Sequence, residues 1–364
     1  MTAGELDATF FRMVTDWRAG GPGCDAERFD AHARALFAHQ IEHNAPYGRF
    51  AASRGFSRAQ PPATWREIPA VPASAFKDAT LATFDIARAE LEFHTSGTTA
   101  ERSGRHYVER AALYEASFLA GFDRFMLDGA PAPLRFLNLV PDPRSHPHSS
   151  LGSMIGAVSE RRGDGNGAFF LNGDAIEVMG FARALEEAIA CGRAVCVTGT
   201  AFAFVILLDA LEGANRTCSA PPGSLVMETG GFKGRTRAVA RDELYAGLTS
   251  ALGIARERIV AEYGMTELLS QYYDAPETRG DAIRVKVAPP WLRTLVTDAE
   301  GNEVAPGETG YLRHVDLANR SSVLAVQTED RGYARGAGIV LLGRDLDAVA
   351  RGCSLDAEDL RALA

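Results

Sequence analysis

Lysine is the scarcest charged residue in this chain. The sequence has three lysines, Lys77, Lys233 and Lys286, and its 38 basic residues are outnumbered by 47 acidic ones, for a formal net charge of -9. Nucleic acids and anionic membranes attract basic surfaces, so this balance argues against either as the main partner. A small ligand, including an anionic one, would have to be held by local groups.

Long apolar runs and closely spaced cysteines are also missing. The longest apolar run, Ala201–Leu208, is far too short to cross a bilayer. The N-terminus carries two acids before its first arginine and has no continuous apolar stretch, unlike a secretory signal. Five cysteines without such a signal indicate a reducing compartment, and none has the paired spacing of a zinc site. We therefore expect a cytoplasmic protein with no membrane partner.

The order of apolar patterns predicts an α/β fold. With 364 residues, of which 46% are hydrophobic, the chain can bury a large core. Residues 6–17 and 25–43 have helical spacing, and from residue 91 short β-prone runs alternate with helical ones. This alternation predicts a largely parallel sheet flanked by helices on both faces. The predicted strands are 91–94, 135–140, 195–199, 225–228 and 259–262, and the predicted helices are 108–126, 150–159, 175–190, 201–211 and 242–252.

The pattern changes after about residue 282. Strand-like runs and turns dominate from there, which predicts a small β subdomain over about 282–343. We expect one large domain over residues 1–343 that includes this subdomain. Residues 344–364 amount to a hinge and one short helix, which is too little for a second core.

A polar loop follows the predicted strand 91–94. Its sequence, His-Thr-Ser-Gly-Thr-Thr-Ala-Glu-Arg-Ser-Gly over residues 94–104, offers many hydroxyl and backbone N–H donors to phosphate oxygens. It is not a Walker loop, because no Gly-Lys-Ser/Thr ends it, and it is not the dinucleotide glycine fingerprint. By itself the segment is equally compatible with a polar surface turn.

Four segments, in this order, resemble the adenylate-forming superfamily of acyl-CoA synthetases, luciferases and peptide-synthetase adenylation domains. They are the phosphate loop Thr95-Ser-Gly-Thr-Thr99, the pentapeptide Tyr263-Gly-Met-Thr-Glu267, the ribose-binding Thr328-Glu-Asp330 and the hinge Leu342-Gly-Arg344. Segments 147–152, 228–234 and 350–355 are similar to the acyl-protein synthetase (LuxE-type) branch, and the similarity covers most of the chain from about residue 69. The resemblance implies a large N-terminal adenylate-forming domain with parallel sheets and a small β subdomain, and a C-terminal domain that is almost absent.

The resemblance also implies ATP and Mg²⁺ as cofactors and assigns roles to residues. The implied phosphate ligands are Thr95, Ser96, Gly97, Thr98 and Thr99, the adenine contacts are Gly230, Gly231 and Tyr263, and the ribose or phosphate contacts are Asp330 and Arg344. Thr266 would touch the α-phosphate, Glu267 would carry Mg²⁺, and His148 would lie near the α-phosphate or the acyl pocket.

Each assignment has a simpler structural alternative. Glu267 could be a charge at a helix N-terminus, and Asp330 could be a turn residue. Arg344 could simply form an ion pair with Asp345 or Asp347 and have no role toward the ligand. His148 is a lone histidine in a loop, and such residues are usually exposed to solvent.

Two departures from the superfamily pattern stand out. The loop has Ala-Glu-Arg-Ser at residues 100–103 where most relatives end in Gly-Pro-Lys. No lysine occurs beyond Lys286, so this chain cannot supply the catalytic lysine of the usual C-terminal domain.

These features predict ATP-dependent activation of a carboxylic acid to an acyl-adenylate, followed by transfer to a thiol or to a partner reductase. Cys353 is a candidate acceptor, because Arg351 and a helix capped by Ser354 favour its thiolate. The alternative is that it is only a small hinge residue.

Several points stay open at this stage. The acid is either fatty or an aromatic, secondary-metabolite acid, because the branch also resembles enzymes that activate phenazine carboxylates in antibiotic biosynthesis. The competing hypothesis is a nucleotide-binding scaffold that has lost catalysis. The oligomeric state is undetermined, with a homodimer as one option.

Overall fold

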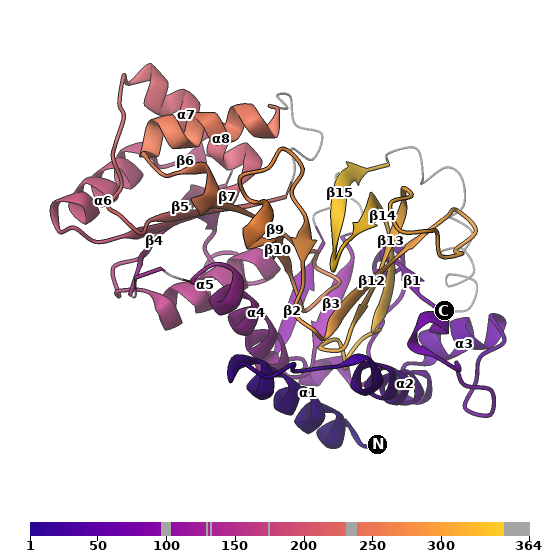
Figure 1. Cartoon of the computed structure of the whole chain (residues 1–364). Helices are drawn as coiled ribbons and strands as arrows, with labels where there is room; N and C mark the ends of the chain where they lie inside the picture. The colour runs from indigo at the N-terminus through magenta and orange to yellow at the C-terminus, as the bar shows by residue number, and fades with distance from the viewer. Residues whose placement is uncertain (96–102, 129, 132, 174, 231–238, 346–364) are drawn as a thin grey trace. The chain divides into compact units, whose positions relative to one another are not determined.

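The computed structural model describes residues 1–95, 103–128, 130–131, 133–173, 175–230 and 239–345 (Figure 1). They form two compact units. Unit 1 comprises Met1–Ala120, Met265–Gln271 and the chain from Val287 onward, and unit 2 comprises Gly121–Gly264 and Tyr272–Lys286. Most of the expected hinge region, 344–364, lies outside the described residues.

Unit 1 begins with three helices whose starts are capped by polar side chains. They are α1 (Ala3–Arg18), α2 (Ala26–His43) and α3 (Ala45–Ser53). Thr2 and Glu5 form a capping box at α1, and Asp25 caps α2 by accepting a hydrogen bond from Arg28 N. Their apolar faces are buried, with Phe10 and Phe29 both at most 1% exposed. The structure confirms the two helices expected near the N-terminus.

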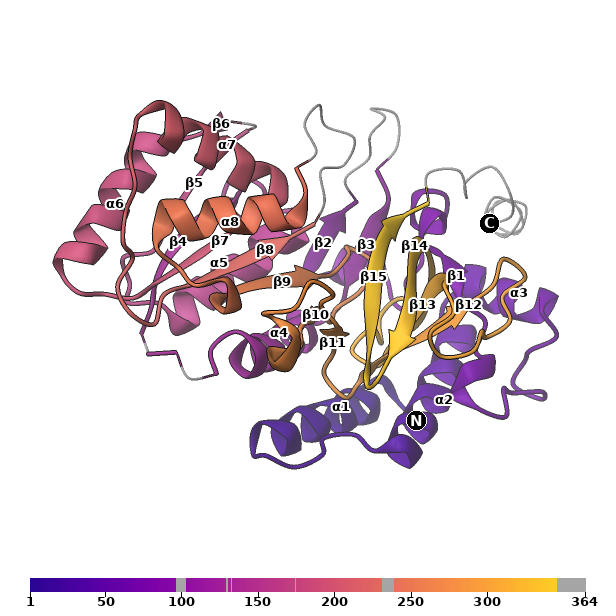
Figure 2. The same cartoon turned by 45° about the horizontal axis from the view of Figure 1, so that its top comes forward.

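Unit 1 also contains strands that pair mainly in antiparallel fashion. Strands β12 (Leu292–Thr297), β13 (Gly310–Asp316), β14 (Ala325–Arg335) and β15 (Gly338–Arg344) pair in that order, and β1 (Val71–Pro72) pairs with β14 in parallel. A separate hairpin joins β2 (Leu91–His94) to β3 (Arg105–Val108), and Figure 2 shows these two strands side by side. From residue 287 to residue 345 the chain therefore consists of strands and turns, as the sequence predicts.

Unit 2 contains the parallel sheet. Its strands are β4 (Arg135–Pro141), β5 (Ala168–Asn172), β6 (Ala175–Ile176), β7 (Val195–Thr200), β8 (Leu225–Thr229), β9 (Ile259–Tyr263) and β10 (Tyr272–Asp274). They pair in the order β10-β9-β8-β7-β4-β5-β6, and the inner pairings from β9 to β5 are parallel. The short strand β11 (Lys286–Val287) lies at the boundary between the units.

Helices alternate with these strands, as expected for a parallel sheet. They are α4 (Ala111–Phe125), α5 (Ser150–Arg162), α6 (Val178–Ala190), α7 (Ala201–Gly213) and α8 (Arg241–Leu252). The short 3₁₀ helices of the chain are η1 (Trp65–Glu67), η2 (Ala73–Lys77), η3 (Ile86–Arg88), η4 (Arg256–Arg258) and η5 (Pro276–Thr278).

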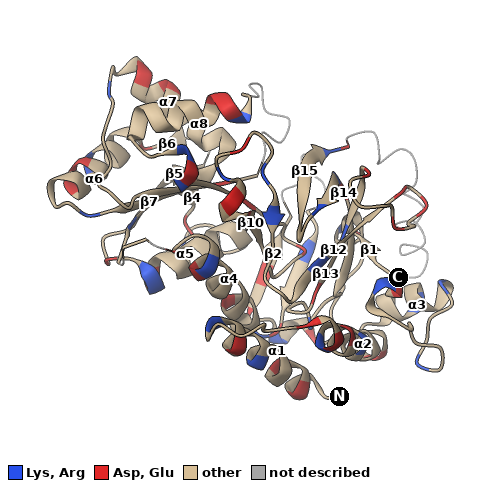
Figure 3. Ribbon diagram, viewed as in Figure 1, with Lys and Arg blue, Asp and Glu red and all other residues tan. Residues whose placement is uncertain are grey.

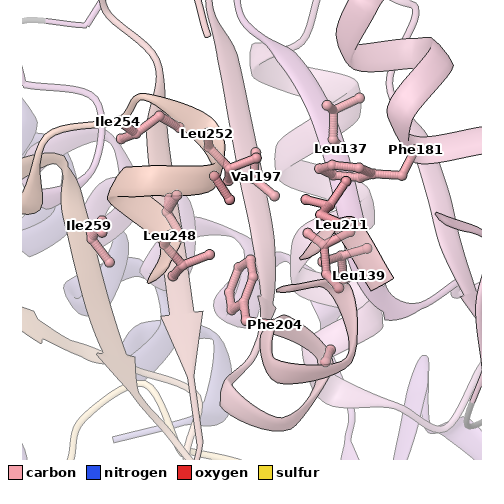
Figure 4. Packing of buried hydrophobic residues seen from close by; sticks show 14 of the residues in the cluster. Leu137, Leu139, Phe181, Val197, Phe204, Leu211, Leu248, Leu252, Ile254 and Ile259 are labelled. Atoms are coloured by element: carbon pink, nitrogen blue, oxygen red, sulfur yellow. The ribbon is translucent and has the colours of Figure 1, made fainter. Parts of the chain in front are cut away.

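The core of unit 2 lies between its sheet and helices α6, α7 and α8. Figure 4 shows Leu137 of β4 beside Phe181 of α6, with Val197 of β7 to one side of them, and Leu248 of α8 near Ile259 of β9. Each of these five side chains is fully buried. Burying a side chain of this size contributes roughly 1.5–3 kcal/mol relative to leaving it exposed. The apolar segment 201–208 therefore contributes mainly to the core, through Ala201, Ala203, Phe204, Val205 and Leu207.

The surface of the helices carries charges of both signs. Figure 3 shows acidic and basic positions interspersed along α1 and α2. Among the described residues, no helix combines the length and the apolarity that crossing a bilayer requires.

Candidate functional site

Two hydrogen bonds in unit 1 close the ends of the loop after β2. The backbone N–H of Thr95 donates to the carbonyl oxygen of Gly104 at 2.9 Å, and the backbone N–H of Gly104 donates to Thr95 Oγ1 at 2.8 Å. A Cβ at position 104 would lie 3.1 Å from the Thr95 hydroxyl and from backbone of Phe76, so a side chain there would crowd this closure. Thr95 therefore fixes the point at which the loop leaves the hairpin.

Glu267 is a buried carboxylate in the short segment that follows β9. Its side chain belongs to unit 1, and the residue is 7% exposed. Burial raises the pKa of Glu267 to about 7, the carboxylates of Glu329 and Asp330 act in the same direction, and the Arg344 guanidinium opposes them. Three carboxylates thus gather around one guanidinium in unit 1. That excess of negative charge and the oxygen donors suit a hard divalent cation such as Mg²⁺.

Asp330 and Arg344 are held by the register of β14 and β15. The two residues are directly paired, and Arg344 Nε lies 3.4 Å from Asp330 Oδ1. Arg344 Nη2 is 4.0 Å from Glu329 Oε2. Burial works against the charge of Arg344, but Asp330 and Glu329 outweigh it, so the pKa of this guanidinium is raised. Arg344 therefore pairs with acids of the Thr328-Glu-Asp330 segment.

The backbone that carries Asp330 is itself anchored. Thr328 Oγ1 donates to the carbonyl oxygen of Leu312 at 2.8 Å and accepts from the backbone N–H of Asp330 at 3.2 Å. The neighbouring Asp345 carboxylate accepts a hydrogen bond from the Tyr311 hydroxyl at 3.1 Å. Thr328 thus anchors the part of β14 that carries Asp330, which is a strand residue and not a turn residue.

The adenine candidates belong to unit 2. Gly230 follows β8 with φ of +67°, a left-handed conformation that favours glycine. Tyr263 ends β9, is 9% exposed and packs with its ring centroid 5.6 Å from that of Tyr272. Its aromatic face is thus partly used in packing within unit 2.

Next to these residues, unit 2 contains a group of buried charges. Thr229 Oγ1 donates a short hydrogen bond to Glu262, and burial raises the pKa of Glu262 to about 7. Tyr245 donates to Glu228 at 3.1 Å, and burial raises the pKa of Glu228 as well. Lys286 offsets both acids electrostatically. The Thr229–Glu262 hydrogen bond in this group links the carboxyl ends of β8 and β9.

Asp274 completes this buried group. Its Oδ1 lies 2.8 Å from Lys286 Nζ, and its Oδ2 lies 2.8 Å from Arg284 Nη1. Although burial acts against its charge, the two cations and the backbone N–H of Ala261 lower the pKa of Asp274. Lys286, one of three lysines in the chain, is thus a buried structural cation.

His148 lies in the exposed loop before α5. The residue is exposed, and the next residue, Ser149, caps α5 by accepting a hydrogen bond from Gly152 N at 3.0 Å. The remaining sequence candidates, Ser96, Gly97, Thr98, Thr99, Gly231 and Cys353, lie outside the described residues.

Four residues of this region were missed by the sequence reasoning: His106, Asp316, Asn319 and Glu329. Asp316 accepts hydrogen bonds from Leu269 N at 2.8 Å and from Ser270 Oγ at 2.7 Å, which anchors the segment that carries Glu267. Burial raises the pKa of Asp316 to about 6. Of these four residues, only Glu329 could have been found from the sequence, because it stands between Thr328 and Asp330 in the segment that resembles the ribose-binding motif.

The family of the chain is decided by a match over nearly its whole length. The model of the acyl-protein synthetase (LuxE) family matches residues 26–359. The chain belongs to the acyl-protein synthetase (LuxE) family. It is accordingly an acyl-adenylate-forming ligase, and the resemblance stated from its motifs is confirmed at the family level. A comparison with curated proteins found no match.

Solved structures confirm the adenylate-forming fold. An open conformation of 2-hydroxyisobutyryl-CoA ligase, in complex with its adenylate and CoA, superposes with a TM-score of 0.62 at 15% identity, covering 88% of this chain and 70% of that one. ATP-bound MatB from Rhodopseudomonas palustris superposes with a TM-score of 0.50 at 19% identity, covering 72% of this chain and 49% of that one. McyG A-PCP, complexed with phenylalanyl-adenylate, gives 0.51 at 16% identity, covering 74% and 49%. The chain therefore spans about half the length of the last two proteins.

Proposed function

We propose that this chain uses ATP and Mg²⁺ to convert a carboxylic acid into an acyl-adenylate, and that Glu267, Asp330 and Arg344 of unit 1 serve this step. A carboxylate oxygen of the substrate forms a bond to the α-phosphorus of ATP. The bond from that phosphorus to the bridging oxygen breaks, and pyrophosphate leaves. Both reactants are anions, so catalysis depends on neutralising and positioning them.

The observation that carries this proposal is the excess of acidic over basic side chains around the buried residue Glu267. Glu267, Glu329 and Asp330 act on one another, and Arg344 is the cation that opposes them. Glu267 would hold Mg²⁺, which when bound supplies positive charge to the phosphates. Thr266, the preceding residue, would contact the α-phosphate.

The nucleotide would be held by groups with matching hydrogen-bonding roles. An ionised Asp330 can accept from both ribose hydroxyls, and Arg344 can hold Asp330 in place or reach the phosphates. Thr95 and the loop up to Thr99 would donate to the β- and γ-phosphates. Gly230, Gly231 and Tyr263 would approach the adenine, and His148 would lie near the acyl pocket.

The acid and its acceptor are the finer part of the proposal. Solved relatives hold a hydroxy-acyl adenylate with CoA in one case and an aminoacyl adenylate in another. Our candidate acids remain the ones that the sequence motifs suggest, fatty acids and aromatic acids, including phenazine carboxylates. We propose transfer to a thiol, either Cys353 or one of a partner, or hand-over to a partner reductase, with the residues from 344 onward acting as a hinge.

Acid-dependent exchange between ATP and pyrophosphate tests the proposal. Wild-type chain should incorporate labelled pyrophosphate into ATP only when its acid is present, and Glu267→Gln should lose this exchange while remaining folded. ATP binding without exchange for any acid would instead support a scaffold that has lost catalysis.

A further inference from the structure

The segment Thr266–Glu267 is contacted from β3 by a buried histidine. His106 Nδ1 lies 2.7 Å from the carbonyl oxygen of Thr266, and His106 Nε2 lies 3.1 Å from Asn319 Oδ1. His106 is fully buried. Both of its ring nitrogens therefore lie at hydrogen-bonding distance from oxygen atoms, and a neutral imidazole, which has one N–H, donates to one of these oxygens at a time.

Asn319 closes this arrangement on the other side of Glu267. Its side-chain Nδ2 donates to the carbonyl oxygen of Glu267 at 2.8 Å. Asn319 is fully buried, and its own carbonyl oxygen accepts from Gln40 Nε2 at 2.8 Å. The four residues thus form a closed chain of contacts from Thr266 through His106 and Asn319 to Glu267.

The two contacted carbonyl groups flank the Cα atom of Glu267. The carbonyl of Thr266 belongs to the peptide plane before this Cα, and the carbonyl of Glu267 belongs to the plane after it. Because peptide units are planar, holding both planes restricts φ and ψ of Glu267. These two angles set the direction of the Cα–Cβ bond and hence where the carboxylate points.

His106 is itself held by its surroundings. It pairs with Phe93 in the β2–β3 hairpin, and the Phe76 ring packs edge-on against it with centroids 5.5 Å apart. It stands two residues after Gly104, where the loop that follows Thr95 returns to the sheet. The same hairpin therefore carries both the candidate phosphate loop and the contact to Thr266.

We propose that His106 and Asn319 are positioning residues, which fix the backbone on both sides of Glu267 and so aim its carboxylate at Mg²⁺ and ATP. This proposal rests on the proposed function for its catalytic consequence. We call the contacts of His106 and Asn319 with residues 266 and 267 the brace. Through the short strand β3, the brace also connects the loop that begins at Thr95 to Glu267. In this proposal both residues act through the backbone of Thr266 and Glu267.

Graded substitutions of His106 separate this role from general stability. His106→Phe keeps an aromatic ring but removes both nitrogens, whereas His106→Asn keeps an amide donor near the position of Nδ1. The matched control is His32→Phe. His32 is a buried histidine of unit 1, 4% exposed, and neither of its ring nitrogens has a hydrogen-bond partner within the described part of the chain.

The expected result is a selective effect on metal use. Loss of a residue that orients a metal ligand costs roughly 10–100-fold in metal affinity or activity. His106→Phe should raise the KM for Mg²⁺ and lower kcat of exchange within that range, with the KM for the acid unchanged. His106→Asn should recover part of the loss, Asn319→Leu should resemble His106→Phe, and His32→Phe should behave as wild type.

Hydrogen–deuterium exchange gives a readout that does not depend on activity. In His106→Phe, a peptide covering residues 263–271 should exchange faster, and a peptide covering 310–316 should not. Unchanged protection of 263–271, or a wild-type Mg²⁺ dependence in folded His106→Phe, would overturn the brace. If the wild-type chain catalyses no exchange with any acid, the proposed function fails, and the protection of 263–271 still decides whether the brace exists.

Discussion

Arg344 Nε lies 3.4 Å from Asp330 Oδ1, across the paired strands β15 and β14. The guanidinium of Arg344 thus pairs with Asp330 and also opposes the rise in the pKa of Glu267. One guanidinium links the proposed ribose contact to the proposed metal ligand.

Replacing Asp330 should weaken nucleotide binding. A hydrogen bond to a charged group contributes about 1.5–3 kcal/mol, so Asp330→Ala should raise the KM for ATP by about 10- to 150-fold. The KM for the acid should change little. Glu300→Ala, at an exposed acid of the same unit, is the control. Equal KM values for ATP in the two variants would remove Asp330 from the site.

Mg²⁺ use should depend on pH through Glu267. Burial raises its pKa to about 7, and the metal binds the ionised form, so binding below pH 7 requires release of a proton. The KM for Mg²⁺ should fall about tenfold per pH unit up to pH 7 and then level off. Glu329 contributes to the raised pKa, so Glu329→Gln should move this midpoint to lower pH. If the pH midpoint of the KM for Mg²⁺ is the same in Glu329→Gln as in the wild type, a group other than Glu267 controls the pH dependence.

The hydroxyl of Thr95 should matter for ATP because it closes the phosphate loop. Thr95→Val leaves the Gly104 N–H without its acceptor, at a cost of about 1 kcal/mol, or roughly a fivefold rise in the KM for ATP. Thr95→Ser should restore the wild-type value. If both variants bind ATP equally well, the closure of this loop has no role in binding.

Glu262 should make stability depend on pH. Its pKa is about 7 in the folded chain against 4.5 as a free side chain, so the folded state holds the extra proton between these values. Stability should therefore decline as pH rises through this window, by up to about 3 kcal/mol. Glu262→Gln removes the titration and should raise the melting temperature relative to wild type more at pH 8 than at pH 5. An equal difference in melting temperature between variant and wild type at pH 5 and pH 8 would show that Glu262 does not titrate between these pH values.

Cys353 has a chemical test although it lies outside the described residues. With ATP and the right labelled acid, an acyl-thiol should form that hydroxylamine cleaves. Cys353→Ser should abolish the label while pyrophosphate exchange persists. A label that survives this substitution would exclude Cys353 as the acceptor.

Much of the fold could be predicted from local patterns. The strand at 91–94 and the helix around 201–211 follow from apolar runs and their period, and both are found. The strands and turns after residue 282 also follow, because turns punctuate short β-prone runs, although their antiparallel pairing was not predicted. Local sequence was sufficient wherever an element is defined by its own residues.

The site could be predicted only where a motif carries it. Glu267 and Asp330 were found through their motifs, but the contacts of His106 with Thr266 and Asn319 span 160 and 213 residues. Such contacts depend on strand pairing and chain path, which one sequence does not reveal. The pairing of Arg344 with Asp330 could not be predicted either, because it depends on the register of β14 and β15.

The most direct measurement is ATP–pyrophosphate exchange by the wild-type chain and by Glu267→Gln, screened over fatty, aryl and phenazine carboxylic acids. We expect rapid exchange with one class of acid in the presence of Mg²⁺, no exchange without acid, and loss of exchange in the folded Glu267→Gln variant. Exchange that persists in Glu267→Gln, or its absence with every acid although ATP binds, would contradict the account.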